Sequence, residues 1–190
     1  MDPLALFTLW YNDWHITNPA EPQAMVLSTA GSDGAVSSRM VLLKDYNEKG
    51  FVFFTNYNSL KSRQLTTNKK AALLFWWQPQ GRQVRIEGTV KKVSRETSLK
   101  YFHSRPRESQ ISAWASEQSS EIPDRRYLEK RFESLSEKFS GRDVDLPPYW
   151  GGLLLTPKRY EFWQEGPHRL HDRIIYLFEK GSWSCRRLAP

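Results

Sequence analysis

The sequence predicts an α+β fold in which helices flank an antiparallel β-barrel. Runs rich in β-branched and aromatic residues recur along the chain, short turn-like sequences separate them, and helix-like segments occur in blocks between them. At 190 residues, with 39% hydrophobic and 14% aromatic content, the chain is long enough to bury one core. We therefore expect a single domain over residues 1–190.

The first element expected is an amphipathic helix over residues 3–15, because Leu4, Phe7, Trp10 and Trp14 follow helical spacing. Hairpin connections are expected at "GSDG", between "AMVLSTA" and "SSRMVLLK", and at "DYNEKG", before "GFVFFTN". A short helix is expected at "SLKSRQLTTN". The strands "KAALLFWWQ" and "RQVRIEGTVKKV" are then expected to pair across "PQG".

A helical insertion is expected at about residues 95–140. "RETSLKYFHS" and "PRESQISAWAS" indicate two helices separated at Pro106, because proline disfavours helical geometry in the residue before it. "PDRRYLEKRFESLSEKF" indicates a third, charged helix that begins at Pro123. The chain then returns to strands at "WGGLLLTP", "RYEFWQ", "RIIYLFE" and "SWSCRRL".

Composition narrows the classes of partner. The net charge of +7 indicates an anionic partner, which is a nucleic acid, a membrane surface or a phosphorylated small molecule. Cys185 is the only cysteine, so an intrachain disulfide and a thiolate metal cage are excluded. Because there is no basic leader and no apolar run near the ~20 residues that cross a bilayer, we expect a cytoplasmic protein without a membrane partner.

The segment Phe162–Ile175 is unusually rich in cations. A strand that starts near Arg169 would place Arg169, His171 and Arg173 on one face. Guanidinium groups suit phosphate oxygens, so this face is either an anion site or a solvated barrel rim. Zinc ligation by His168 and His171 is disfavoured, because the two side chains would point to opposite faces of a strand.

Other cations lie near expected helix starts and strand ends. In "KYFHSRPRESQ", Tyr101, Arg105 and Ser109 flank a helix N-terminus, which suits either a phosphate site or an ordinary capped helix junction. Arg39 and Lys44 are separated by an odd number of residues in one strand-like run, so opposite faces are expected unless a bulge intervenes.

The motifs "RMVLLK", "FTN", "RQVRIEG", "KYFHSRPRESQISAW", "EQSS", "PPYWGG", "EFWQ", "HRLHDR" and the terminal "RLAP" lie in this order along the chain. Together they resemble the pyridoxine (pyridoxamine) 5′-phosphate oxidase family over nearly the whole chain. The resemblance implies an FMN-binding split β-barrel and a homodimer with two FMN sites at its interface. It also implies that oxygen oxidises pyridoxine or pyridoxamine 5′-phosphate to pyridoxal 5′-phosphate, with release of hydrogen peroxide.

The resemblance also assigns roles to residues, with no metal and no nucleic acid among the ligands. The implied FMN contacts are Arg39, Met40, Val41, Leu42, Leu43, Lys44, Phe54, Thr55, Lys61, Gln83, Gln118, Ser119, Trp163 and Arg173. The implied holders of the substrate phosphate are Lys44, Tyr101, Arg105 and Ser109. Arg169 and His171 are implied to lie over the substrate's pyridine ring as catalytic residues, and which of them takes a proton is left open.

Three departures from the family pattern stand out. Leu60 occupies a position where an arginine that contacts the FMN phosphate is usual, Phe54 replaces a common tyrosine, and no basic arm precedes Asp2. Arg63, one helical turn after Leu60, either reaches the FMN phosphate instead or is a solvated surface cation. Two rival functions are a non-catalytic flavin or B6-phosphate-binding split barrel, and a basic aromatic barrel that binds single-stranded nucleic acid.

Overall fold

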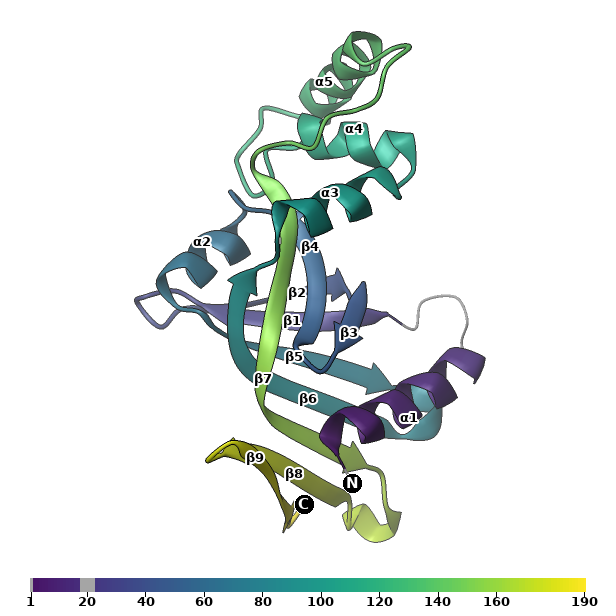
Figure 1. Cartoon of the computed structure of the whole chain (residues 1–190), viewed down its shortest axis with the longest axis vertical. Helices are drawn as coiled ribbons and strands as arrows, with labels where there is room; N and C mark the ends of the chain where they lie inside the picture. Colours follow the sequence, from purple (N-terminus) through teal and green to yellow (C-terminus); the bar gives the residue numbers. More distant parts are fainter. Residues whose placement is uncertain (1, 18–22) are drawn as a thin grey trace.

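The computed structural model describes residues 2–17 and 23–190, in which nine strands form one sheet (Figure 1). All hydrogen-bonded strand pairs in this part of the chain are antiparallel. The order is β2-β1-β5-β6-β7-β4-β3, and β8 pairs with both β7 and β9. The strands are β1 Ala24–Ala30, β2 Val36–Leu42, β3 Asp45–Asn47, β4 Gly50–Asn56, β5 Lys70–Trp77, β6 Arg82–Lys92, β7 Trp150–Gln164, β8 Asp172–Glu179 and β9 Ser182–Leu188.

Five α-helices accompany the sheet in the described residues. They are α1 Pro3–Thr17, α2 Leu60–Thr67, α3 Arg95–His103, α4 Arg107–Ala115 and α5 Arg125–Lys138. Short 3-10 turns, η1 Gln78–Gln80 and η2 Pro167–Arg169, follow β5 and β7. Helices α3 and α5 begin where a side chain satisfies a free backbone N–H group: the Ser94 hydroxyl accepts from Thr97 N, and the Asp124 carboxylate accepts from Tyr127 N.

The expected hairpins form, with one addition. β1 and β2 pair across "GSDG", and β5 and β6 pair across "PQG". In "DYNEKG", Asp45–Asn47 forms the short strand β3, which pairs with β4. The expectation that this whole segment only connects two strands is therefore wrong, because a tight turn at residues 48–49 leaves its first half free to join the sheet.

β7 is one strand of 15 residues, although two strands were expected from "WGGLLLTP" and "RYEFWQ". It pairs with β6 from Leu153 to Gln164, with β4 in its first half and with β8 in its second half. Pro157, the last residue of the first expected strand, lies at a register shift, because Gly88 of β6 pairs with Pro157 and Glu87 pairs with Arg159. A Cβ at Gly88 would lie 2.1 Å from the Thr156 carbonyl oxygen, so the bulge requires glycine there.

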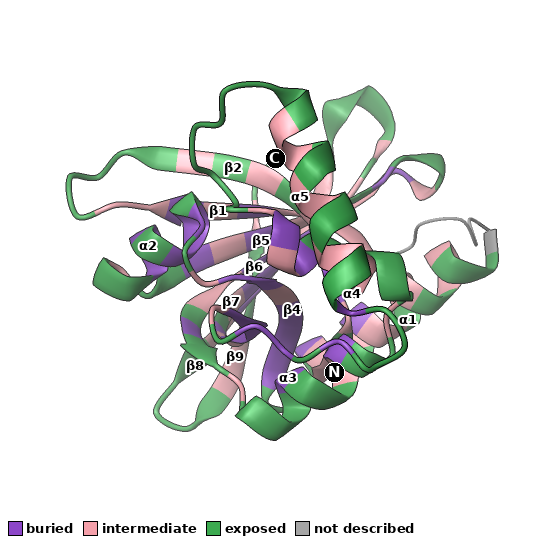
Figure 2. Ribbon diagram, turned by 90° about the horizontal axis from the view of Figure 1, so that it is seen from above, coloured by how far each residue is buried: buried purple, intermediate pink, exposed green. Residues whose placement is uncertain are grey.

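The main core lies between the concave sheet and α1. Phe7 of α1 is fully buried and its ring packs edge-on against Phe51 and Phe75, as the helical spacing predicts. A second, smaller core of Phe102, Ile111, Phe139, Val144, Leu146 and Trp150 joins the helical insertion to the start of β7. Figure 2 shows β4 and β7 buried inside, whereas α5 is mostly exposed.

No helix in the described part of the chain is long and apolar enough to cross a membrane.

Candidate functional site

A cavity of about 970 Å³ lies between β2, β4, the start of α2 and the helices α3 and α4. Its volume is near the upper end of the usual range for ligand sites, about 300–1,000 Å³. It is lined by Ser37, Ser38, Arg39, Met40, Val41, Leu42, Lys44, Phe54, Thr55, Asn56, Leu60, Lys61, Tyr101, Arg105, Pro106, Ser109, Ser112, Ala113, Ser116, Gln118, Ser119 and Trp150.

Four cations line this cavity, and none of its described lining residues is aspartate or glutamate. Arg39 comes from β2, Lys44 from the segment after β2, Lys61 from α2, and Arg105 from the α3–α4 junction. Four positive charges with no carboxylate beside them repel one another. The cavity is therefore built for an anion.

Lys61 is the most deeply buried of these cations, with 7% of its surface exposed. Its ammonium donates only to neutral oxygens: Thr55 Oγ1 at 3.2 Å, Ser59 Oγ at 3.3 Å and Gln118 Oε1 at 3.4 Å. Burial, together with the charge of nearby Arg39, lowers the pKa of Lys61 to about 8. An anion in the cavity would favour the charged form and raise this pKa again.

Arg39 is held by a buried network. Its Nη1 donates to Thr29 Oγ1 at 2.7 Å and to the Leu27 carbonyl at 3.1 Å, and Thr29 Oγ1 donates to Gln64 Oε1 at 2.6 Å. Burial lowers the pKa of Arg39. Because β1 and α2 both fix this guanidinium, it is positioned before any ligand binds.

Arg105 lies against an aromatic stack. Its guanidinium carbon is 4.8 Å from the centre of the Trp150 ring, and the Tyr101 ring stacks on Phe54 at 3.9 Å and on Trp150 at 6.2 Å. Arg105 Nη1 is buried without a hydrogen-bond partner among the described residues. Burial lowers the pKa of Arg105, and burial together with Arg105 lowers the pKa of Lys44. An unpartnered donor in such a place indicates a missing acceptor.

The structure corrects two arguments about strand faces. β2 ends at Leu42, so the odd separation of Arg39 and Lys44 does not set their faces, and both line the cavity. β8 begins at Asp172, not near Arg169, because the turn η2 gives His168 a φ of 55° and Arg169 a φ of 63°. The expected single strand face of Arg169, His171 and Arg173 is therefore wrong.

A second cluster gathers other predicted residues at the far end of β7. Gln83, Trp163 and Arg173 are direct neighbours across β6, β7 and β8. The His171 ring lies 4.6 Å from the Trp163 ring, and its Nδ1 accepts from the Gly166 backbone at 3.3 Å. Arg169 is exposed beside them. None of these five residues is among those that line the cavity.

The predicted site residues thus separate into two groups. The cavity is lined by Arg39, Met40, Val41, Leu42, Lys44, Phe54, Thr55, Lys61, Tyr101, Arg105, Ser109, Gln118 and Ser119, whereas the second cluster contains Gln83, Trp163, Arg169, His171 and Arg173. The Leu43 side chain lies in the main core, 3% exposed. Arg63 is exposed, donates to the Asn58 carbonyl at 2.5 Å and does not line the cavity, which Leu60 does.

Sequence reasoning gave no role to Trp150 or Glu161. Trp150 lies in the motif "PPYWGG", which predicted only the start of a strand. Glu161, in "EFWQ", is 3% exposed. The available signal was a carboxylate inside an aromatic strand, since a buried charge is nearly always paired. The described residues contain no group of three or more His, Cys, Asp or Glu side chains that could hold a metal ion.

Comparison with known proteins agrees with this architecture. Residues 17–139 match the family described as pyridoxamine 5′-phosphate oxidase, and residues 150–190 match the pyridoxine 5′-phosphate oxidase C-terminal dimerisation region. Proteins named pyridoxine/pyridoxamine 5′-phosphate oxidase from Gloeothece citriformis and Aliarcobacter butzleri are each 50% identical over 190 residues. These alignments cover 100% of this chain and 89% and 90% of those proteins.

The chain also resembles solved structures. PhzG from Burkholderia lata, in complex with tetrahydrophenazine-1-carboxylic acid, matches with a TM-score of 0.94 and 31% identity over 100% of this chain and 93% of that one. A pyridoxamine 5′-phosphate oxidase-related, FMN-binding protein from Nostoc punctiforme matches with a TM-score of 0.79 and 15% identity, over 100% and 99% of the two chains, which shows the fold alone.

The curled antiparallel sheet with its flanking helices is the fold of the FMN-binding split-barrel proteins. Within that class, the chain belongs to the pyridoxine/pyridoxamine 5′-phosphate oxidase family, whose members are flavin-dependent oxidoreductases of vitamin B6 metabolism.

Proposed function

We propose that this protein is an FMN-dependent oxidase that converts pyridoxamine or pyridoxine 5′-phosphate to pyridoxal 5′-phosphate. Oxygen accepts two electrons and two protons and leaves as hydrogen peroxide; with the amine substrate, water supplies the aldehyde oxygen and ammonia is released. The observation that carries the proposal is the cavity with four cations and no carboxylate among its described lining residues. Two phosphate-bearing molecules, a cofactor and a substrate, would supply the missing negative charge.

The residues present fit FMN. Lys61, Thr55 and Gln118 lie within hydrogen-bond distance of one another, with Arg39 nearby, and would hold its phosphate. Met40 and Leu42 leave apolar side chains exposed beside them, which suits a flat ring. When bound, FMN supplies the two-electron acceptor for the substrate.

Arg105, Tyr101, Ser109 and Lys44 are proposed to hold the substrate phosphate. The unpartnered Nη1 of Arg105 would donate to a phosphate oxygen, and Ser109 in the first turn of α4 adds a hydroxyl near free backbone N–H groups. Anchoring both phosphates in one cavity holds substrate and cofactor rings at a fixed separation.

The second cluster is proposed to complete the site from a second copy of the chain. Gln83, Trp163, Arg169, His171 and Arg173 do not line the cavity, yet the family resemblance assigns all five to the same site. The match of residues 150–190 to the family's dimerisation region supports a homodimer. In it, Arg169 and His171 would cover the substrate ring and exclude water.

The test is to load the purified protein with FMN and to measure oxygen consumption and pyridoxal 5′-phosphate formation with each substrate, while light scattering gives the molecular mass. We expect turnover by a dimer that holds one FMN per chain. A flavin-loaded protein that consumes no oxygen with either substrate would instead support the non-catalytic carrier. Salt-sensitive oligonucleotide binding by flavin-free protein would support the nucleic-acid-binding barrel.

A further inference from the structure

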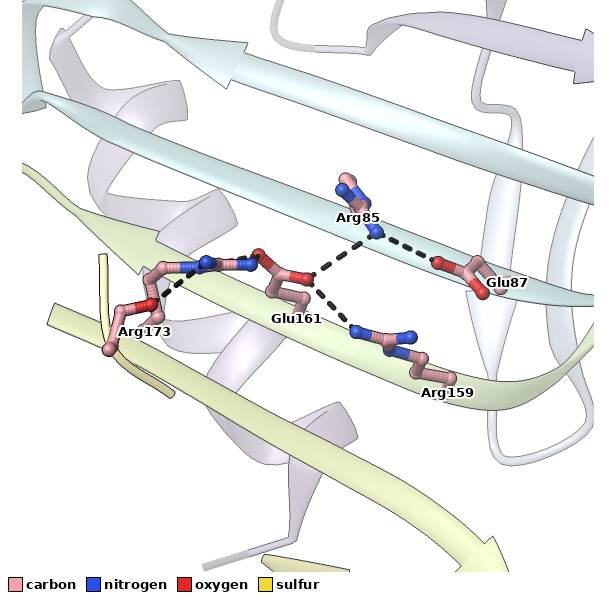
Figure 3. Close-up of polar contacts among 6 residues, drawn as sticks. Arg85, Glu87, Arg159, Glu161 and Arg173 are labelled. Atoms are coloured by element: carbon pink, nitrogen blue, oxygen red, sulfur yellow. Dashed lines mark hydrogen bonds and ion pairs between the residues drawn. The ribbon is translucent and has the colours of Figure 1, made fainter. Parts of the chain in front are cut away.

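Glu161 lies on β7 next to the second cluster, in a place where a carboxylate is costly to bury. It is 3% exposed, and its side chain is surrounded by guanidinium groups from three different positions, Arg85, Arg159 and Arg173 (Figure 3). A buried carboxylate needs such partners. We therefore ask how Glu161 affects the position of each arginine side chain.

Arg173 is held more firmly than the other two arginines. Its Nε and Nη2 donate to Glu161 Oε1 at 3.0 and 2.8 Å, and its Nη1 donates to the Ala189 carbonyl at 2.9 Å. Contacts through all three nitrogens fix both the position and the plane of the guanidinium. These contacts use three of its five N–H groups, which leaves two to donate to a ligand.

The other oxygen of Glu161 is occupied as well. Arg159 Nη2 lies 3.3 Å and Arg85 Nη2 3.5 Å from Oε2, and Arg85 also contacts Glu87 at 3.0 Å (Figure 3). With Oε2 engaged by these two cations, the carboxylate presents Oε1 to Arg173 in one orientation. Glu161 is therefore a fixed acceptor and not a mobile surface charge.

We propose that Glu161 is a positioning residue that, with the Ala189 carbonyl of the "RLAP" terminus, holds Arg173 in the orientation from which it donates to the flavin nucleotide. This inference rests on the proposed assignment of Arg173 to the cofactor. Because Glu161 already compensates part of the charge of Arg173, the contribution of Arg173 to binding depends on the direction of its N–H groups. Glu161 acts only through Arg173.

The test is a double-mutant cycle on FMN affinity. Apo-protein is titrated with FMN by flavin fluorescence quenching for the parent, Glu161→Gln, Arg173→Ala and the double variant. We expect Glu161→Gln to raise the Kd about tenfold in the parent and less than twofold in the Arg173→Ala background. The matched control is Glu87→Gln, which removes a carboxylate that contacts Arg85 but not Arg173, and should change the Kd less than twofold.

Arg173→Lys provides a second, independent variant, because it keeps a cation beside Glu161 but loses the planar set of guanidinium N–H donors. We expect its Kd to rise at least fivefold, close to that of Arg173→Ala, while its thermal unfolding stays near that of the parent. A parental Kd for Arg173→Lys, or an equal effect of Glu161→Gln in both backgrounds, would overturn the proposal. A parental Kd for Arg173→Ala would overturn the assignment of Arg173 to the cofactor instead.

Discussion

The cations of the cavity and the cations around Glu161 differ in one respect, which is whether the chain supplies their counter-ion. Arg85, Arg159 and Arg173 converge on a buried carboxylate. Lys61 and Arg105 are also buried or half-buried, yet among the described residues they contact neutral oxygens and aromatic rings. The first group has a carboxylate partner in the free chain, whereas the second group gains an anionic partner only when a ligand binds.

The difference teaches how to separate cations that the chain itself pairs with a carboxylate from cations whose anionic partner is a ligand. A cation held by an internal carboxylate stabilises the fold, and removing its partner leaves an uncompensated buried charge. A desolvated cation without a carboxylate destabilises the free fold and is retained for its ligand. Four predictions test this distinction.

The largest effect is expected from removing the shared counter-ion. Glu161→Ala should lower the free energy of unfolding of the apo-protein by about 3 kcal/mol, because three guanidinium groups then lose their carboxylate. Lys61→Met, which removes a buried cation from the cavity, should leave that free energy unchanged or raise it. Urea unfolding at one protein concentration measures both, and equal destabilisation by the two variants would contradict the distinction.

Arg105→Ala should weaken substrate binding far more than cofactor binding. A charge-assisted hydrogen bond contributes roughly 1.5–3 kcal/mol, so the KM for pyridoxamine 5′-phosphate is expected to rise about ten- to hundredfold. The FMN Kd should change less than twofold, since Lys61 and Arg39 are assigned to that phosphate. Steady-state kinetics and flavin titration give the two values, and equal losses would show that the cavity is not divided into two phosphate sites.

FMN affinity should fall as the pH rises above 8. Burial and Arg39 lower the pKa of Lys61 to about 8 in the free protein, and a bound phosphate raises it again because it favours the ammonium form. Affinity is therefore fully present below pH 8 and decreases above it, by at most about tenfold per pH unit. Titrations between pH 7 and 9.5 measure the slope, which Lys61→Met should abolish.

The smallest effects are expected at the helix that carries Leu60. Leu60 lines the cavity and is 42% exposed, so Leu60→Arg should improve the FMN Kd by about two- to fivefold, the range of an exposed ion pair. Arg63→Ala should change it less than twofold, because Arg63 is exposed and donates to the Asn58 carbonyl. A loss above fivefold in Arg63→Ala would restore the idea that Arg63 compensates for Leu60.

Much of the fold could be predicted because it depends on local patterns. Short stretches of sequence predict the alternation of buried and partly exposed residues in β1 and the helix break at Pro106. Both are present in the structure. β7 was divided wrongly, because a proline looks like a strand end, whereas here Lys158, the residue after Pro157, is the extra residue of a bulge opposite Glu87 and Gly88 of β6. The strand continues through this bulge because β6 pairs with β7 on both sides of it, and that pairing is a tertiary feature.

The candidate site was harder to predict where backbone conformation overrides alternation. Arg169 fits a strand by composition, but its positive φ turns the chain, and β8 starts only at Asp172. Arg39 and Lys44 line one cavity, although an odd separation in a strand would place them on opposite faces. The role of Glu161 depends on three partners from β6, β7 and β8, which only the sheet register brings together.

The length of β7 has a genetic consequence. Trp150 lines the cavity and Trp163 belongs to the second cluster, so roughly 40 Å of strand lies between them at about 3.3 Å per residue. Because β7 holds the two regions this far apart, the second cluster of one chain cannot reach the cavity of the same chain. Two variants that each bind FMN more weakly, Lys61→Met and Arg173→Ala, should therefore complement each other when co-expressed. Each mixed dimer would contain one site with neither substitution and one site with both.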